Sequence, residues 1–200
     1  MLEPMFKSMT LTEAREAVRL CNSYNLLPKI IGLCSNLDVA DWLRLLGENW
    51  TGCDNISQFA GELMGETPLS YVLDGEHALR QHLMDEREAD HFAGLPDSVT
   101  AWRGCYAHNK CGLSWSLERA TAERFPFLHR YRAEGQPLLV RAEVRKGDII
   151  ALKLDRDEAE IITASPKISA TSHIKFTGMS GSEESLHLFP PPDHNQHTEY

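Results

Sequence analysis

The sequence predicts an α+β fold, in which a helical N-terminal region, residues 1–93, packs on a mostly antiparallel sheet. Two observations support this prediction. Apolar residues recur at helical spacing through the first half of the chain, whereas short runs of β-forming residues follow Gly94-Leu-Pro-Asp97. A chain of 200 residues is long enough to bury a core without a metal or a disulfide. We therefore expect a helical region over 1–93, a sheet region over 94–189 and a polar tail over 190–200.

Local signals mark several helices in the first region. Thr10-Leu-Thr-Glu13 has the form of a capping box, in which a hydroxyl and a carboxylate satisfy amides at a helix start. Asp38 is suited to cap another helix, which Gly47 is expected to end. Helices are expected over residues 10–22, 26–33, 39–46, 55–64 and 74–93.

The second region has the composition of a sheet with one helix inserted, residues 117–125. Lys146-Gly-Asp148 is expected to be a hairpin turn. Strands are expected over residues 99–102, 113–116, 138–144, 148–154, 160–163 and 173–176. Residues 190–200 have too little apolar content to order themselves.

The net charge bears on the class of partner. The chain has 20 basic and 29 acidic side chains, which give a formal charge of −9. Affinity for nucleic-acid backbones and for anionic membranes comes mostly from Lys and Arg. We therefore expect no membrane partner and no broad nucleic-acid groove, whereas an acidic surface suits a basic protein partner such as a host protein.

The cysteines indicate a reducing compartment. They are five in number, lie far apart in the sequence and follow no secretory segment. The cytoplasm of a bacterium or of a host cell is the expected location, and no apolar run approaches the ~18 residues of a membrane span. Cys105-x2-His108-x2-Cys111 has three metal-ligand residue types but no convincing fourth, so no metal site is expected.

Trp102-Arg103-Gly104, at the end of a predicted strand, is the first of three motifs whose side chains are suited to catalysis or ligand binding. In one interpretation Arg103 is a surface side chain beside a turn glycine. In the other, the strand holds Arg103 so that its guanidinium offers two parallel donors to a phosphate. The tripeptide itself does not decide between them.

The second motif is Ser114-Trp-Ser116, directly before a predicted helix. Side chains alternate across a strand, so both hydroxyls are expected on one face, with Trp115 packed beneath the sheet. For Ser116 the favoured role is the helix N-cap, whereas the role of Ser114 stays open between ligand contact and orientation of a carboxylate.

The third motif is Glu158-Ala-Glu160, where the acidic run that begins at Asp155 enters an apolar strand. A solvated loop is one interpretation of such a run. In an extended chain, however, two glutamates at i and i+2 point the same way. Two carboxylates on one face suggest a division of labour, in which one stabilises a positive reacting centre and the other orients a nucleophile.

In this order, the three motifs resemble the arginine–serine–glutamate group of NAD-dependent mono-ADP-ribosyltransferases, over residues 98–163. The resemblance implies a split, mostly antiparallel sheet with NAD, as substrate, in the cleft between its halves. Residues 94–189 would then form a catalytic region that transfers ADP-ribose to a protein side chain and releases nicotinamide. The segment 45–55 resembles small proteins of phages and prophages.

The resemblance also implies individual roles. Arg103 grips NAD, Ser114 braces the catalytic glutamate, Glu160 is that glutamate, and Glu158 orients a target arginine. Cleavage of the nicotinamide–ribose bond creates an oxocarbenium-like centre, which an ionised carboxylate bound to the ribose 2′-hydroxyl stabilises. The expected catalytic residues are Glu158 and Glu160, and the expected NAD-binding residues are Arg103, Gly104, Ser114, Ser116 and Phe125.

An aromatic wall for nicotinamide is expected from Phe125, Phe127 or Tyr131, although a core position explains each ring equally well. The helical region is expected to recognise the target or to form a wall over the NAD cleft.

Two other functions are compatible with the sequence. With water as acceptor, the same site makes the protein an NAD glycohydrolase. In a different class, a non-catalytic phage-type protein binds and inhibits a host factor, with the sheet as scaffold.

Overall fold

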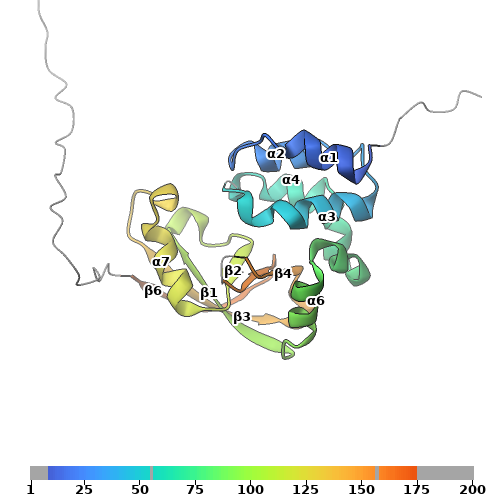
Figure 1. Ribbon diagram of the computed structural model, residues 1–200. Coiled ribbons are helices and arrows are strands. Elements are labelled where there is room, and N and C mark those ends of the chain that lie inside the picture. The colour runs from blue at the N-terminus through green and yellow to red at the C-terminus, as the bar shows by residue number, and fades with distance from the viewer. Residues whose placement is uncertain (1–8, 55, 156–157, 175–200) are drawn as a thin grey trace, which may run out of the picture.

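The computed structural model describes residues 9–54, 56–155 and 158–174. Helices occupy these residues up to Ala93 and strands begin at Ser98, which confirms the predicted α+β class (Figure 1). The expected tail, residues 190–200, lies outside the described residues. No helix in the described part of the chain has the length and apolar character that crossing a membrane requires.

The first half consists of short α- and 3-10 helices. They are α1 (Leu11–Val18), α2 (Leu26–Ile31), α3 (Val39–Asn49), η1 (Trp50–Gly52), η2 (Ile56–Gln58), α4 (Ala60–Gly65), α5 (Leu69–Leu73), η3 (His77–Leu83) and α6 (Glu86–Ala93). The second half contains β1 (Ser98–Cys105), η4 (Ala107–Asn109), β2 (Ser114–Ser116), α7 (Arg119–Arg124), η5 (Phe125–Phe127), η6 (His129–Tyr131), β3 (Leu138–Arg145), η7 (Lys146–Asp148), β4 (Ala151–Lys153), β5 (Glu160–Ile162) and β6 (Lys167–His173).

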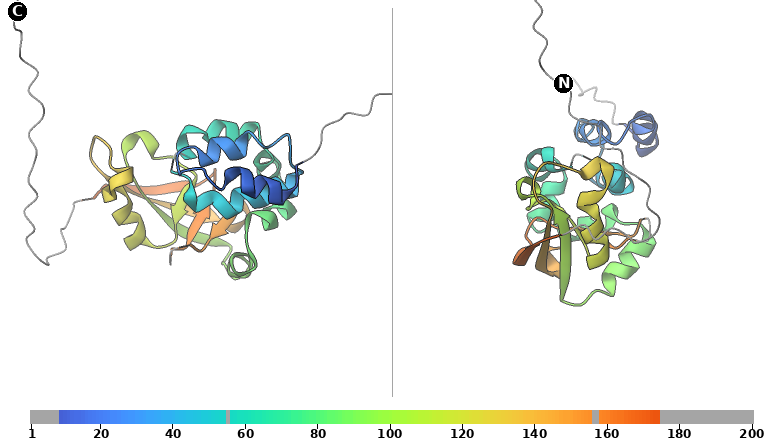
Figure 2. Two further views of the ribbon diagram at one scale, coloured as in Figure 1. Left: turned by 45° about the horizontal axis from the view of Figure 1, so that its top comes forward. Right: turned by 90° about the vertical axis from the view of Figure 1, so that its left-hand side faces the viewer.

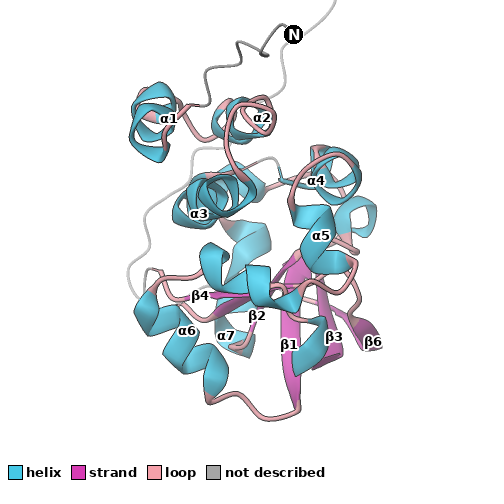
Figure 3. Ribbon diagram, turned by 90° about the vertical axis from the view of Figure 1, so that its right-hand side faces the viewer, coloured by secondary structure: helices cyan, strands magenta, loops and turns pink. Residues whose placement is uncertain are grey.

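The helical region lies in layers over the sheet. Helices α1 and α2 are outermost, and α3 lies between them and the sheet (Figure 3). Helix α3 packs on η3, while η3 and α6 contact β4. The buried core of the helical region extends onto apolar side chains of the sheet region, namely Leu113, Ile150, Ala151 and Ile162.

The helix starts follow the local signals. Thr10 and Glu13 form the predicted capping box, and the Asp38 carboxylate accepts a hydrogen bond from the Asp41 amide at 2.9 Å. The single helix predicted over 74–93 is wrong, because a second capping box starts a new helix within it. Asp85 accepts from the Glu88 amide at 2.7 Å while the Glu88 carboxylate accepts from the Asp85 amide at 3.0 Å.

Gly47 does not end α3, as the sequence had suggested, but lies inside it. A Cβ atom at this position would lie 2.2 Å from the carbonyl oxygen of Leu83. The glycine therefore allows the backbone of η3 to approach α3 closely.

Gly47→Ala is expected to lower the free energy of unfolding by about 1–3 kcal/mol, because the new methyl group meets rigid backbone rather than a movable side chain. Gly61→Ala is the matched control, since a Cβ at that helical glycine meets nothing within 4 Å. That control should leave stability unchanged or raise it by up to ~1 kcal/mol. Urea unfolding of both variants measures the difference, and equal effects would contradict the close approach.

The strands form one open sheet in the order β4-β5-β2-β1-β3-β6, with every neighbouring pair antiparallel. Long ladders join β1, β3 and β6, and short ladders join β4, β5 and β2. A single register pair, Trp102 opposite Ser116, connects β1 to β2. The predicted antiparallel sheet is thus confirmed, and its narrowest point lies between β1 and β2.

Two strand predictions need correction. Lys146–Asp148 is no hairpin turn but the 3-10 segment η7, because β3 pairs with β1 and β6 whereas β4 pairs with β5. The chain crosses to the other half of the sheet at this point, and Ile149 and Ile150 are buried there. The final strand, expected over 173–176, is β6 at Lys167–His173, and residues 175 and 176 lie outside the described part.

Helix α7 packs on β1 and β2, as Figure 2 shows. Gly104 faces this helix and lies within β1. The interpretation that made it a turn glycine is therefore wrong. A Cβ at Gly104 would lie 1.8 Å from the carbonyl oxygen of Ala122 in α7. Glycine is therefore what brings the helix onto the strand, at the edge of the cavity described next.

Candidate functional site

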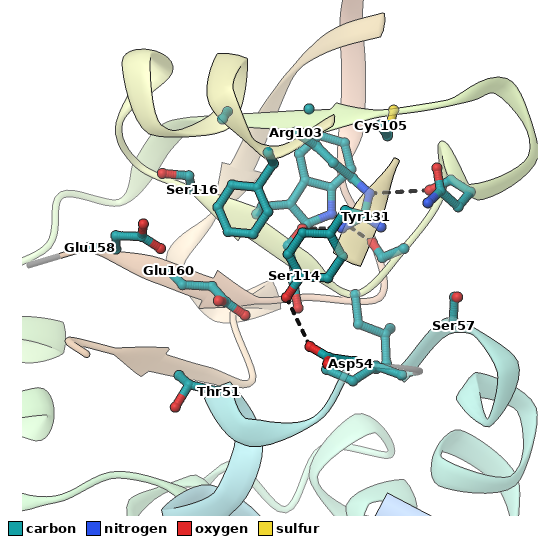
Figure 4. A pocket seen from close by; sticks show the side chains of 18 of the residues that line it. Thr51, Asp54, Ser57, Arg103, Cys105, Ser114, Ser116, Tyr131, Glu158 and Glu160 are labelled. Carbon is teal, nitrogen blue, oxygen red and sulfur yellow. Dashed lines mark hydrogen bonds between the residues drawn. The ribbon is translucent and has the colours of Figure 1, made fainter. Parts of the chain in front are cut away.

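A cavity of about 230 Å³ lies between the helical region and the narrow middle of the sheet. The walls come from η1 and the residues after it, from β1, β2 and β5, and from the segment after α7 (Figure 4). All seven expected site residues line this one cavity, namely Arg103, Gly104, Ser114, Ser116, Phe125, Glu158 and Glu160. The structure therefore brings the three sequence motifs together.

Glu160 is the first residue of β5 and lines the cavity. Its Oε1 accepts a hydrogen bond from Trp50 Nε1 at 2.8 Å, and the Ser114 side chain, which also lines the cavity, favours the ionised carboxylate. Burial raises the pKa of Glu160 above its ordinary value. The Trp50 hydrogen bond, the Ser114 side chain and the charge of Arg103 act in the opposite direction and lower the pKa, because each of them stabilises the ionised form.

Glu158 lies in the turn before β5, where its amide bonds to the Asp155 carbonyl at 3.0 Å. Its carboxylate and that of Glu160 lie on the same side of the cavity (Figure 4), and its charge adds to the rise in the pKa of Glu160. The solvated-loop interpretation fits the exposed Asp155 but not the two glutamates, which are both half-buried.

Arg103 is half-buried, so it is no ordinary surface side chain. Its guanidinium donates to the backbone carbonyls of Ser114 and Asn109, the latter at 3.2 Å. It also lies flat against Gly112, where a Cβ would come within 2.1 Å of Nη2. Arg103 thus supports the loop between β1 and β2, and it brings positive charge to the cavity wall.

The two serines have different surroundings. Ser114 faces Glu160, whereas the Ser116 hydroxyl bonds to both the amide and the carbonyl of Glu118, at 3.0 Å each. The N-cap of α7 is Glu118, so the role predicted for Ser116 as cap is wrong, and Ser116 instead holds the turn before the helix. Trp115 is buried in the core of the sheet, as expected.

Aromatic rings form one side of the cavity. Phe125 and Tyr131 both line it, with ring centroids 5.4 Å apart, whereas Phe127 is not among the lining residues. The Tyr131 hydroxyl donates to Asp54 at 3.3 Å, which links the segment after α7 to the helical region (Figure 4).

Six lining residues come from the helical region and were not predicted from the sequence. They are Trp50, Thr51, Cys53, Asp54, Ile56 and Ser57. Trp50 lies 110 positions from Glu160 in the chain. No local pattern separates it from Trp42, which is equally buried but donates its indole N–H to the carbonyl of Ile30. The sequence predicted a contribution of the helical region only in general terms, as target recognition or as a wall over the NAD cleft.

The Cys-His-Cys motif is dispersed. Cys105 is buried and Cys111 is exposed, while the His108 ring stacks on Tyr106. Among the described residues, no group of three or more His, Cys, Asp or Glu side chains is arranged to hold a metal ion.

Comparisons of the chain with models of protein families, with curated proteins and with solved structures find no match. A proposal for the function of the protein therefore has to rest on the residues that line the cavity. Their chemistry consists of two neighbouring carboxylates, a half-buried guanidinium, two aromatic rings and the indole N–H of Trp50.

Proposed function

We propose that the protein transfers ADP-ribose from NAD to a protein side chain, by preference arginine, with release of nicotinamide. The proposed fold identity is a sheet of the ADP-ribosyltransferase type. The observation that carries the proposal is the carboxylate of Glu160, which is bonded to the indole of Trp50 inside a cavity that Ser114 and Arg103 also line.

In this proposal Glu160 performs the central step. Its ionised carboxylate accepts a hydrogen bond from the ribose 2′-hydroxyl and stabilises the oxocarbenium-like centre as the bond to nicotinamide breaks. The Trp50 indole N–H is already bonded to the carboxylate, so this donor needs little reorganisation in the transition state. The rings of Phe125 and Tyr131 offer an apolar wall for nicotinamide, and Arg103 supplies positive charge for the diphosphate.

The size of the cavity limits how much of NAD it encloses. At about 230 Å³ it is smaller than the roughly 300–1,000 Å³ of pockets that enclose drug-sized ligands. The nicotinamide and its ribose are therefore the part proposed to enter, with the diphosphate at the mouth.

A contact over the cavity favours a second candidate, hydrolysis of NAD at the same site. The hydrogen bond between Tyr131 and Asp54 joins two walls of the cavity, and in this proposal it restricts the entry of a protein side chain. Water requires no such access. Glu158, in contrast, favours arginine as acceptor, because a second carboxylate beside Glu160 suits a guanidinium.

Incubation with NAD labelled in its adenosine part, with and without a bacterial lysate, tests the proposal. Nicotinamide release with label on protein supports transfer, whereas release with free ADP-ribose supports hydrolysis. Label on nucleic acid would overturn the preference for arginine. A protein that binds no NAD would instead fit the non-catalytic phage-type inhibitor.

Glu158→Gln is expected to leave NAD hydrolysis within about threefold of the wild type while reducing transfer to arginine about a hundredfold or more. The amide keeps the size of the side chain but loses the charge that orients a guanidinium, an effect within the range for a single electrostatic contact. Parallel assays of nicotinamide release and of labelled acceptor measure the two activities. Equal survival of both would show that Glu158 does not orient the target.

A further inference from the structure

The indole of Trp50 joins the helical region to the carboxylate of Glu160. Trp50 begins η1, is 1% exposed and packs in the core of the helical region. Its Nε1 nevertheless donates to Glu160 Oε1 at 2.8 Å, on the first residue of β5. The apolar part of the Trp50 side chain thus packs in the core of the helical region, while its indole nitrogen bonds to a carboxylate that lines the cavity.

The next residue makes a second contact to the same acidic segment. Thr51 Oγ1 donates to Asp155 Oδ2 at 2.6 Å, and Asp155 precedes the turn that carries Glu158. Two consecutive residues of η1 therefore bind the side chains of Asp155 and Glu160. The positions of these two carboxylates depend on how η1 packs against the sheet.

We propose that Trp50 is a positioning residue, which keeps Glu160 ionised and directed into the cavity, so that the helical region completes the site. The effect of Trp50 on catalysis rests on the proposed cleavage of NAD. Trp50 favours the ionised form of Glu160 because of the kind of donor that it provides. An indole N–H donates and never accepts, and its bond to an ionised oxygen is about twice as strong as a bond to a neutral one.

The other polar neighbours do not replace this donor. The Ser114 hydroxyl donates or accepts, so it suits either protonation state of the carboxyl. Arg103 directs Nε and Nη1 to two backbone carbonyls and acts on Glu160 through its charge. The charged groups around Glu160 are Arg103 on β1, Glu158 and Asp155 in the turn before β5, Asp54 after η1, and Lys153 on β4, which pairs with Glu88.

Trp50→Phe tests the proposal, with Trp42→Phe as the matched control. Both residues are buried tryptophans of the same helical core, and each indole makes one hydrogen bond, but that of Trp42 goes to a backbone carbonyl. The two variants lose the same atoms. Only Trp50→Phe removes a donor from the carboxylate.

The titration of the Glu160 side-chain carboxyl, followed by carbon NMR and assigned with Glu160→Gln, is the primary measurement. Loss of a charge-assisted donor is expected to raise the pKa of Glu160 by about one further unit in Trp50→Phe and to leave it unchanged in Trp42→Phe. An unchanged pKa in Trp50→Phe, or an equal rise in both variants, would overturn the proposal.

Should Trp50→Phe fail to fold, the wild-type protein gives the answer directly. The chain has four tryptophans, so the indole N–H signals are few enough to assign. The Trp50 signal should move with the ionisation of Glu160, and this pH dependence should vanish in Glu160→Gln. A Trp50 signal that is insensitive to pH in the wild type would contradict the contact.

Nicotinamide release provides the catalytic readout. In Trp50→Phe the acidic limb of the kcat profile should move to higher pH by about one unit with KM unchanged, because less Glu160 is ionised at a given pH. Absence of NAD cleavage in the wild type would refute the proposed function, while the carboxyl titration would still decide the role of Trp50.

Discussion

Glu160→Gln is expected to lower the rate of nicotinamide release about a thousandfold or more while leaving the fold intact. The amide has nearly the same shape as the carboxylate and keeps an oxygen that can accept from Trp50 Nε1. It carries no charge, however, and therefore cannot stabilise an oxocarbenium-like centre. Steady-state release of nicotinamide measures the loss, and near-normal turnover would reject the proposed function.

Glu123→Gln is a suitable control for this substitution, because Glu123 pairs with Arg119 on the exposed side of α7. Its activity should equal that of the wild type. A similar loss in both variants would mean that removing any acidic charge is enough, and that Glu160 has no special part.

Glu160→Gln is also expected to change the stability of the protein. Burial raises the pKa of Glu160 above its unfolded value, so the native state binds the proton more tightly than the unfolded chain. Stability therefore falls as the pH rises from the unfolded pKa through the folded one. Glu160→Gln should be at least as stable as the wild type at neutral pH, and any gain should disappear at acidic pH. Urea unfolding at both pH values checks this sign.

Glu88→Ala is expected to lower the free energy of unfolding by about 3–5 kcal/mol. Glu88 and Lys153 form an ion pair at 2.6 Å with side chains only 7% and 8% exposed, and Glu88 Oε1 also accepts from the Leu154 amide. Removal of the carboxylate leaves a buried ammonium whose other bond is to the carbonyl of Leu83. Urea unfolding measures the loss.

The double variant Glu88→Ala/Lys153→Met separates the ion pair from simple packing. It should recover part of the lost stability, because no uncompensated charge stays buried. The surface pair between Arg119 and Glu123 gives the comparison, and Glu123→Ala should cost only about 0.3–0.5 kcal/mol. No recovery in the double variant would show that the lost contacts of Glu88 with the backbone dominate.

Much of the secondary structure was predictable because its signals are local. The capping box of Thr10 and Glu13 and the cap at Asp38 act within one helical turn, and both were predicted. Gly47 misled the prediction because the reason for a glycine there is the approach of η3, which no local pattern contains. The hairpin predicted at Lys146–Asp148 was wrong for the same reason. Whether two consecutive strands pair depends on the order of strands in the whole sheet, which no local pattern contains.

The site, like the fold, was predictable where it depends on neighbouring residues and not where it depends on contacts between distant segments. Alternation along a strand correctly predicted that Ser114 on β2 and Glu160 on β5 point toward one cavity, because side-chain direction in an extended chain follows from the sequence. Glu158 also lines the cavity, but it lies before β5, so alternation along that strand is not what places it there. The contribution of Trp50 could not be predicted, since it depends on how the helical region packs on the sheet. The support that Arg103 gives to the loop before β2 also depends on folded backbone.

The junction between β1 and β2 has a mechanical consequence. One residue pair, Trp102 opposite Ser116, ties together two halves that each hold their own ladders. The carboxylate of Glu160 belongs to one half and the guanidinium of Arg103 to the other. A single register pair leaves little backbone hydrogen bonding to fix the angle between the two halves. The distance between the carboxylate and the guanidinium therefore depends on the other contacts that join the halves, namely the packing of α7 on both β1 and β2 and the hydrogen bond from Arg103 to the Ser114 carbonyl.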